Sequence, residues 1–539
     1  MSWILNKVFG GKLRHETERY LRDLARAPVE SSRRNAKELL TRLRQEPDPK
    51  VTLGETMWGE PVEVALGEIL ASHGLATGGT GSGKTRFALL ILKTMIELAP
   101  NDSAGGFGIV DPKGDLFSGA AYLLARRLEH LARHDPPGAK ELRRRIVMID
   151  FSNREALTSF NILARWPNAD PDQFAANRGD LLLCDLLPGS DKLSLGGGAL
   201  LRRLVLLLSD PSVNLPIPSL DAVLRDEPLR RRLVAQCRNG SVAAYFARQF
   251  PRIPASTVAA LDRRLDALFS SEGVRLALSG ITAPDFRRLQ DEGKFILIGL
   301  GQNIPRSVRQ LLQCILVSDI AQSVFCRDCT EAPFLWLLDE AQNLFTSRAV
   351  YDRMSDLLTM ARSFGSHILL MMQNAASAVG DARMLKTVYT NIKWSFSMRG
   401  EPGDCAFLKS VLPITGRKLR PQASPFQEKS FYSLAEERGT ALEEIAHLPD
   451  RVGYLWLKAR SAEAIKIKTQ ELAIPQGRKL DEAIAPIRRD PTIGMRFSRQ
   501  EYERLIDERD RKWTAKEQGD LATTLRKAYQ RARGKGDGR

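Results

Sequence analysis

The sequence predicts an α/β fold in which a mostly parallel β-sheet is covered by helices on both faces. Short, continuously apolar runs of strand length alternate with amphipathic stretches of helical period, as expected for strands that are buried on both faces. One of the first runs leads directly into a glycine-rich turn and then a helical stretch, which is typical of parallel α/β proteins. The clearest apolar runs are residues 74–77, 107–110, 146–149, 295–300, 334–338, 368–372 and 392–398.

The glycine-rich turn fits the phosphate-binding pattern G-x-x-x-x-G-K-[ST] over residues 78–85. In this pattern, backbone N–H groups and the amino terminus of the next helix surround the phosphates of a nucleotide. Lys84 is expected to reach the β- and γ-phosphates, and Thr85 to hold Mg²⁺. The pattern therefore predicts a RecA-like P-loop NTPase core with ATP and Mg²⁺ as cofactors. The expected nucleotide-binding residues are Gly78, Thr80, Gly81, Ser82, Gly83, Lys84, Thr85 and Arg86.

A pair of carboxylates follows the apolar run 334–338, at Asp339 and Glu340. A carboxylate at the end of a buried strand can enter the magnesium shell, and a second can activate the attacking water. Asp339 is therefore the expected metal ligand and Glu340 the expected catalytic base. A second carboxylate favours hydrolysis over transfer to a small substrate, because such a substrate brings its own hydroxyl. The pair predicts an ATP hydrolase.

Two further side chains are candidates for a catalytic role. Gln373 ends the run 368–372, where a RecA-like core would place it beside the γ-phosphate as a sensor; the alternative is an ordinary polar strand end. Arg362 precedes this run and is the candidate arginine finger, which would stabilise charge on a nucleotide held by a neighbouring subunit. The alternative for Arg362 is a surface arginine.

Changes of pattern divide the chain into five segments. Residues 1–59 form a charged helical leader, and residues 60–169 and 286–475 supply the two parts of the nucleotide-binding domain. Residues 170–285 lose the strand pattern and consist of successive helical stretches broken by prolines, which predicts an all-α insertion domain. Residues 476–539 form a basic helical tail, in which a solvated helix face is favoured over a nucleic-acid contact for Trp513.

The composition is that of a folded protein with a basic excess. The chain has 539 residues, with 80 Lys and Arg against 64 Asp and Glu, a formal net charge of +16. This favours a polyanionic partner, because basic side chains release counterions from phosphate backbones. Six cysteines are too few for a disulfide scaffold and indicate a reducing compartment. No stretch approaches the roughly 20 apolar residues of a membrane-spanning helix, so we expect a cytoplasmic protein without an integral membrane segment.

The motifs, taken in order, resemble those of the FtsK/HerA superfamily of P-loop ATPases. Within it they are most similar to the coupling ATPases of type IV secretion and conjugation, the TraD and TraG kind. Their order and spacing match over residues 60–475. The motifs are residues 76–85, Val110-Asp-Pro-Lys-Gly-Asp115, Ile149-Asp-Phe-Ser152 with Ser159-Phe-Asn161, Leu338-Asp-Glu-Ala-Gln-Asn343, Arg362-Ser-Phe-Gly365 and the strand that ends in Gln373.

The resemblance implies a homo-hexameric ring with DNA, single- or double-stranded, in its central channel. It implies that Arg362 acts between subunits, that Gln373 is the sensor, and that the helical insertion contacts a relaxase or other type IV secretion components. Members of the family usually begin with a membrane anchor, which is not expected here, so any attachment to the inner membrane would be peripheral. Arg-Ser-Phe-Gly also departs from the family's Arg-Lys-x-Gly.

Three functions are compatible with these features. The leading one is an ATP-driven DNA translocase that acts as a soluble coupling protein in conjugative DNA transfer or type IV secretion. A HerA-like or FtsK-like DNA pump in DNA processing or phage defence would need a separate nuclease, because no nuclease motif is visible in this chain. A nucleotide-gated recruitment platform would bind protein or nucleoprotein cargo without moving it. Glu340 distinguishes the last, because a binding switch can dispense with a water-activating base.

Overall fold

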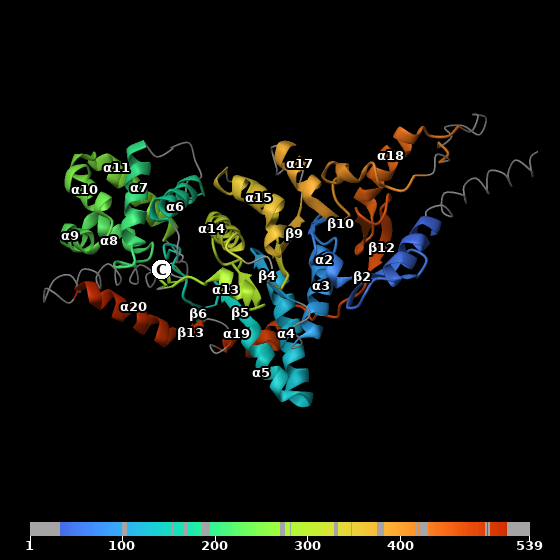
Figure 1. Ribbon diagram of the computed structural model, residues 1–539, viewed down its shortest axis with the longest axis horizontal. Coiled ribbons are helices and arrows are strands. Elements are labelled where there is room, and N and C mark those ends of the chain that lie inside the picture. Colours follow the sequence, from blue (N-terminus) through green and yellow to red (C-terminus); the bar gives the residue numbers. More distant parts are fainter. Residues whose placement is uncertain are drawn as a thin grey trace, which may run out of the picture. The chain divides into compact units, whose positions relative to one another are not determined.

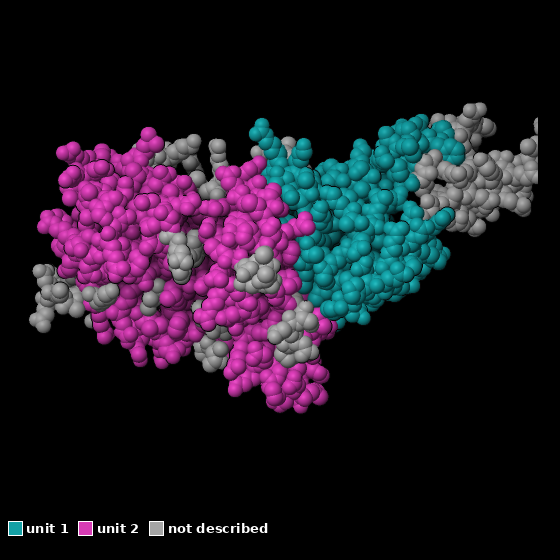
Figure 2. Space-filling model, in the orientation of Figure 1, with its two compact units in different colours: residues 1–94, 369–473 teal, residues 95–368, 474–539 magenta. Residues whose placement is uncertain are grey.

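The computed structural model consists of two compact units, unit 1 with residues 1–94 and 369–473 and unit 2 with residues 95–368 and 474–539 (Figure 2). Helix α3 (Lys84–Leu98) and strand β9 (Ser366–Met372) run from one unit into the other. The structure describes residues 33–99, 105–153, 155–165, 170–185, 195–269, 275–276, 278–280, 282–327, 332–346, 348–373, 382–414, 418–420, 430–490, 493 and 496–514.

Unit 1 contains a mixed β-sheet with the strand order β2-β1-β12-β11-β10-β3-β9. Strand β3 lies between two parallel neighbours, β9 and β10, and all of its residues are buried. The remaining pairs are antiparallel, an extension that the apolar runs do not predict. The bounds are β1 Lys50–Thr56, β2 Pro61–Ala65, β3 His73–Thr77, β10 Ile392–Met398, β11 Val452–Leu457 and β12 Ile465–Thr469.

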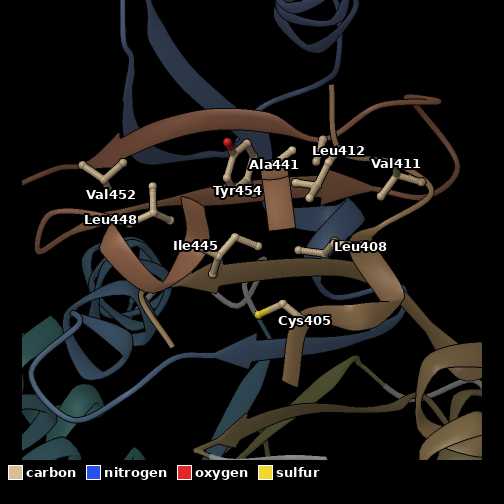
Figure 3. Close-up of a cluster of buried hydrophobic side chains, with 10 residues drawn as sticks. Cys405, Leu408, Val411, Leu412, Ala441, Ile445, Leu448, Val452 and Tyr454 are labelled. Carbon is tan, nitrogen blue, oxygen red and sulfur yellow. The ribbon is translucent and has the colours of Figure 1, made fainter. Parts of the chain in front are cut away.

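Helices and short 3-10 turns of unit 1 pack around an apolar cluster (Figure 3). Helix α18 begins with a capping box, in which the Ser433 side chain accepts from the Glu436 N–H and the Glu436 side chain accepts from the Ser433 N–H. The cluster contains Cys405, Leu408, Val411, Leu412, Ala441, Ile445, Leu448, Val452, Tyr454 and Ala464. Residues 33–44 are also helical, and the other bounds are α2 Leu66–Ile69, α17 Ala382–Asn391, η5 Pro402–Leu408, α18 Leu434–Glu443 and η6 Glu444–His447.

Unit 2 contains a fully parallel sheet with the strand order β8-β4-β7-β5. Every residue of these strands is buried, as continuous apolar runs predict. Trp336 of β8 lies over Gly108 of β4, where a Cβ atom would come within 2.2 Å of the indole ring. The bounds are β4 Gly106–Asp111, β5 Ile146–Asp150, β7 Phe295–Gly299 and β8 Phe334–Leu338.

The long helices of unit 2 cover this sheet (Figure 1), and most residues of α14 are buried. It runs over 19 residues from Arg306 to Val324. Within the described residues, no helix is both long and apolar enough to cross a membrane. The other bounds are α4 Asp115–His134, α5 Pro136–Arg145, α13 Phe286–Asp291, η3 Ala341–Thr346, α15 Arg348–Met360 and η4 Ala361–Phe364.

The segment between β6 (Ala156–Thr158) and α13 belongs to unit 2, and the regular structure of its described residues is helical. A buried ion pair joins it to α14, with Arg178 Nη2 2.5 Å from Asp319 Oδ1. The five segment boundaries expected from the sequence remain predictions. The helices are α6 Pro171–Asp185, α7 Leu195–Leu208, α8 Ser219–Arg225, α9 Glu227–Gln236, α10 Gly240–Arg248 and α11 Ala255–Leu268, with the 3-10 turn η2 Phe250–Arg252.

The chain after Ile474 returns to unit 2 as α19 (Arg478–Arg489), β13 (Arg496–Ser498) and α20 (Arg499–Thr514). Strand β13 pairs with β6, and Tyr502 and Ile506 of α20 pack on Leu157. Trp513 is only 5% exposed, so its expected place on a solvated face is wrong. Buried aromatic and aliphatic side chains hold α20 to the unit instead.

Candidate nucleotide site

The P-loop lies in unit 1, between the end of β3 and the start of α3. Gly81 and Gly83 have φ angles of 77° and 117°, a region that side chains with a Cβ rarely enter. The Gly78 N–H donates to Met372 O at 3.3 Å, and the Gly79 N–H donates to Arg399 O at 2.7 Å. The loop is therefore fixed to the ends of β9 and β10, the two parallel neighbours of β3.

Lys84 points back into this loop. Its side chain is buried with 7% of the residue exposed, and Nζ donates to Gly78 O at 2.5 Å and to Gly79 O at 3.1 Å. An ammonium enclosed by backbone is where the pattern predicts the lysine that meets phosphate oxygens. The site therefore holds a fixed positive charge at the turn.

Ser82 supplies an observation that fits a phosphate group. The residue is 1% exposed, and its hydroxyl has no hydrogen-bond partner within the described residues. Buried polar atoms are normally paired, and phosphate oxygens at a helix amino terminus would supply the missing acceptors. The residues of the loop therefore fit the phosphates of a nucleotide.

Gln373 lies next to the P-loop within unit 1. The Thr80 hydroxyl donates to Gln373 Oε1 at 2.9 Å, because β9, which ends just before Gln373, is hydrogen-bonded to β3. Thr85 is half-buried at the start of α3, and Arg86 Nη1 donates to Leu472 O at 3.3 Å. The structure thus brings the expected sensor to the expected phosphate loop.

The carboxylate pair lies in unit 2, at the end of β8. The Asp339 N–H donates to Val110 O at 3.1 Å, and Gln313 of α14 donates through Nε2 to Asp339 O at 2.9 Å. Asp339 is 4% exposed and Glu340 9% exposed. The backbone at this strand end is therefore fixed, and both carboxylates are largely buried.

Asp111 forms a third carboxylate at this edge, because β4 pairs with β8 and Val110 is opposite Leu338. Asp111 is fully buried, and its oxygens accept from the N–H groups of Lys113, Gly114 and Phe117, each at 2.8 Å. Burial raises the pKa of Asp111, and these three hydrogen bonds oppose that rise.

Burial also raises the pKa of Asp339 to about 7, and the neighbouring Asp111 and Glu340 charges add to the rise. Such crowding of negative charge favours a divalent cation. Within the described residues, no group of three or more His, Cys, Asp or Glu side chains forms a ready-made metal site. The expected Mg²⁺ ligands, Thr85 and Asp339, remain a prediction.

Glu340 is engaged through both carboxylate oxygens. Lys113 Nζ lies 2.6 Å from Oε1, and Gln342 donates through Nε2 to Oε2 at 2.5 Å. Sequence reasoning did not assign Asp111, Lys113, Gln313 or Gln342. The sequence did contain a signal for Asp111 and Lys113, because the motif at 110–115 lies at the end of a second apolar strand that ends in an aspartate.

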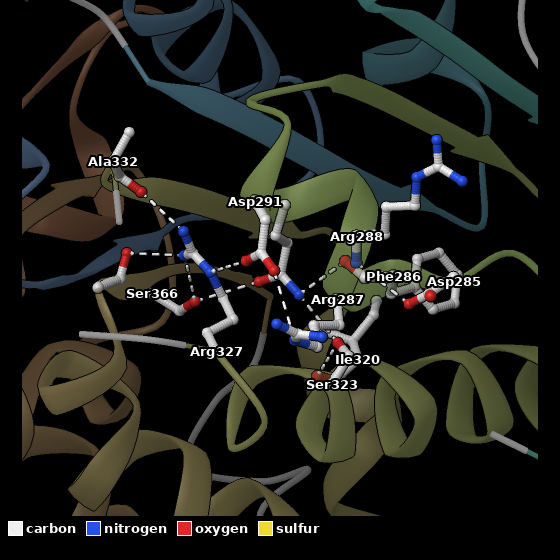
Figure 4. A network of polar contacts seen from close by, with 12 residues as sticks. Asp285, Phe286, Arg287, Arg288, Asp291, Ile320, Ser323, Arg327, Ala332 and Ser366 are labelled. Atoms are coloured by element: carbon white, nitrogen blue, oxygen red, sulfur yellow. Dashed lines mark hydrogen bonds and ion pairs between the residues drawn. The ribbon is translucent and has the colours of Figure 1, made fainter. Parts of the chain in front are cut away.

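Arg362 lies in the 3-10 turn η4 and is exposed. Two hydrogen bonds fix the end of this turn, because Gly365 O accepts from the Phe334 N–H at 2.9 Å and from Arg327 Nη1 at 3.1 Å. Arg327 also contacts Asp291, Ser366 and Ala332 in a buried polar network (Figure 4). The exposed guanidinium suits a contact outside this unit, and its role as a finger remains a prediction.

The glycine-rich phosphate loop on a parallel strand, with carboxylates at the ends of two further parallel strands, defines the P-loop NTPase class of α/β fold. No protein-family model and no curated protein sequence matches the chain. Solved structures do: VirB4 of Thermoanaerobacter pseudethanolicus has a TM-score of 0.50 at 14% identity, over 79% of this chain and 98% of that one. The expected α/β P-loop fold is thereby confirmed, and so is the resemblance to this group of ATPases at the level of the fold.

Two other similar structures have lower scores. The plasmid coupling protein TrwB, in complex with ADP and Mg²⁺, has a TM-score of 0.49 at 15% identity, over 84% of this chain and 94% of that one. The cytoplasmic domain of the type VII secretion ATPase EccC of Thermomonospora curvata has a TM-score of 0.31 at 14% identity, over 82% of this chain and 32% of that one.

Proposed function

We propose that this chain hydrolyses ATP to move DNA through a homo-hexameric ring, as a coupling protein of conjugative DNA transfer or type IV secretion does. The observation that carries the proposal is the Asp339–Glu340 pair beside Asp111, at the ends of neighbouring parallel strands. A protein that only binds nucleotide has no need of a water-activating base at this position. The VirB4 fold supports the assignment to a secretion-type motor.

The proposal gives each residue of the site a role. Backbone N–H groups of 78–85 and the Lys84 ammonium bind the phosphates, and Glu340 accepts the proton of the attacking water. Thr85 and Asp339 would hold Mg²⁺, which when bound offsets the charge of the phosphate oxygens. Gln373 would detect the γ-phosphate through its contact with the loop, and Arg362 would reach the nucleotide of the adjacent subunit.

ATP turnover tests the hydrolase assignment. We expect Glu340→Gln to bind a fluorescent ATP analogue as wild type does but to lose turnover by about 10²-fold or more, the scale of general-base catalysis. Lys84→Ala should lose turnover and most nucleotide binding, whereas Lys409→Ala, at an exposed position of unit 1, should change neither. Turnover by Glu340→Gln at the wild-type rate would reject the hydrolase and favour the recruitment platform.

DNA stimulation tests the motor assignment. The net charge of +16 supports a nucleic-acid partner, and the stimulation should weaken as salt rises because counterion release weakens. Turnover is measured with single- and double-stranded DNA at several salt concentrations. A turnover rate that neither DNA form changes would remove translocation while leaving the ATP hydrolase.

Ring assembly and the finger need a separate measurement. Particle images with ATP and duplex DNA should show six-membered rings around DNA, and monomers under those conditions would reject the ring. Rings mixed from Arg362→Ala and Glu340→Gln subunits should regain activity that neither variant has alone. In such rings the Glu340→Gln subunits supply the arginine finger and the Arg362→Ala subunits supply the base. A fully active ring of Arg362→Ala alone would exclude the finger role.

The cellular setting belongs to the same proposal. The helices within 170–285 would contact a relaxase or other secretion components, between the two parts of a nucleotide-binding domain at 60–169 and 286–475, with the leader at 1–59 and the tail at 476–539. The protein would work in the cytoplasm, with any contact to the inner membrane peripheral. Co-purification of a nuclease in place of such partners would favour the DNA-processing or defence pump.

A further inference from the structure

Both oxygens of the proposed base are already occupied by side chains of its own unit. Lys113 contacts Glu340 Oε1 at 2.6 Å, and Gln342 donates to Oε2 at 2.5 Å. The Glu340 side chain is 11% exposed, so little of it is open to water in this arrangement. Each contact takes one of the two lone-pair sites of its oxygen, so the positions from which an attacking water could donate to the base are restricted.

Lys113 is held in place by contacts with its backbone as well as by its charge. Asp111 Oδ1 accepts from the Lys113 N–H at 2.8 Å. Arg309 of α14 donates through Nη1 to Pro112 O at 3.1 Å, and Gln302 donates through Nε2 to Lys113 O at 3.1 Å. Three side chains from two strand ends and a helix thus fix the loop that carries the ammonium.

Glu340 itself has a backbone conformation that is costly to maintain. Its φ is 50°, in the left-handed region that residues with a Cβ seldom adopt. Such conformations persist where the surroundings hold them, and they are frequent at functional sites and switches. The Glu340 carbonyl accepts from the Asn343 N–H at 3.0 Å, which is one of the contacts that hold it. The residue is therefore set in a restrained position, from which a change of neighbours can release it.

We propose that Lys113 is a positioning residue that restrains the base, so that ATP is hydrolysed slowly until the loop at 112–114 moves and frees Glu340. This inference rests on the proposed function, since it assigns the regulation of the same site. The exposed Gln302 side chain gives the release a route, because any molecule that displaces it withdraws a contact from the Lys113 backbone. The restraint acts on turnover and leaves nucleotide binding alone.

Steady-state ATP turnover without DNA tests the restraint, in wild type, Lys113→Met, Lys113→Arg, Glu340→Gln and the double variant Lys113→Met/Glu340→Gln. Lys113→Met should raise kcat at least about fivefold with KM unchanged, since a fivefold change is small against the scale of barrier changes at active sites. Lys113→Arg keeps the charge and should give a smaller rise. The double variant should be as inactive as Glu340→Gln, which shows that the gain passes through the base.

Two variants serve as controls. Lys140→Met makes the same substitution at an exposed position of α5 and should leave kcat at the wild-type value. Arg309→Met removes a contact to the loop without touching Glu340, and it should also raise kcat. Equal rises in Lys140→Met and Lys113→Met would overturn the inference.

The two proposals fail in different ways. If wild type turns over ATP and Lys113→Met is equal to it or slower, with fluorescent-nucleotide binding intact, the restraint is wrong and the hydrolase stands. If wild type and every variant bind nucleotide and none hydrolyses it, both the hydrolase assignment and the proposed restraint are wrong. A merely structural ion pair would lower kcat or stability on removal, and would not raise kcat.

Discussion

The buried ion pair between α6 and α14 offers the sharpest test of how the helical segment is attached to the rest of unit 2. The Arg178 and Asp319 side chains are each 3% exposed. The Arg178 Nε and Nη1 atoms are buried with no hydrogen-bond partner within the described residues. Burial raises the pKa of Asp319, and the Arg178 charge opposes that rise. The pair is thus poorly compensated, and each partner depends on the other.

The expected magnitudes follow from that burial. Arg178→Met leaves a buried carboxylate without its counter-charge, which costs about 3–5 kcal/mol. Replacing both partners by apolar residues, as Arg178→Met/Asp319→Leu, removes the charges together and should cost less than either single change, because buried pairs can be replaced at little net cost. At about 2 °C per kcal/mol for a unit of this size, the single change corresponds to roughly 6–10 °C in the unfolding midpoint.

Thermal unfolding of the full chain measures these differences. The control is Arg202→Met: Arg202 Nη2 lies 2.6 Å from Asp180 Oδ1, between α7 and α6, but the two side chains are 49% and 44% exposed. This exposed pair should matter by about 1 kcal/mol or less. A midpoint for Arg178→Met within the shift of the control, or a double variant less stable than both single ones, would refute the reasoning.

Two further predictions concern the parallel sheet of unit 2 and the start of β9. Gly108→Ala should destabilise the protein by about 1–3 kcal/mol, because its Cβ would lie 2.2 Å from the Trp336 ring. In urea unfolding, Gly108→Ala/Trp336→Phe should recover part of this loss. An unchanged urea midpoint for Gly108→Ala would contradict the prediction. Burial, with the Arg362 and Arg327 charges, lowers the pKa of His367 from 6.5 to about 4. As the pH falls, the unfolded chain therefore binds a proton at His367 before the folded chain does. The free energy of unfolding should fall by about 3 kcal/mol between pH 6.5 and pH 4. His367→Gln should flatten that fall in urea midpoints measured across this range, and an unchanged slope would exclude His367 as the cause.

Local patterns predict the parallel strands and the phosphate loop well. A strand buried on both faces must be apolar along its length, and the P-loop is contiguous in sequence, so neither depends on distant residues. The apolar runs do not predict strands β1, β11 and β12 of unit 1, although β12 alternates apolar Ile465 and Ile467 with exposed or half-buried lysines. Tyr502, Ile506 and Trp513 form an apolar stripe on α20 that its charged composition conceals.

The site was predictable only as far as its residues are local. Asp339 and Glu340 follow an apolar strand directly, so their place at a strand end can be read from the sequence. The contact between Lys113 and Glu340 depends on the register of β4 against β8, which pairs Val110 with Leu338. No spacing along the chain encodes that register. For the same reason, the sequence does not predict that Gln313 of α14 donates to the Asp339 carbonyl.

Helix α14 has a mechanical consequence. Its 19 residues form a rod about 28 Å long, which bends little over such a length. Arg309, Gln313 and Asp319 lie on this one rod, and they grip the Pro112 carbonyl, the Asp339 carbonyl and the Arg178 guanidinium. A displacement of α6 would therefore be transmitted through α14 to the Pro112 and Asp339 carbonyls. By the same contacts, a displacement of these carbonyls would be transmitted to α6.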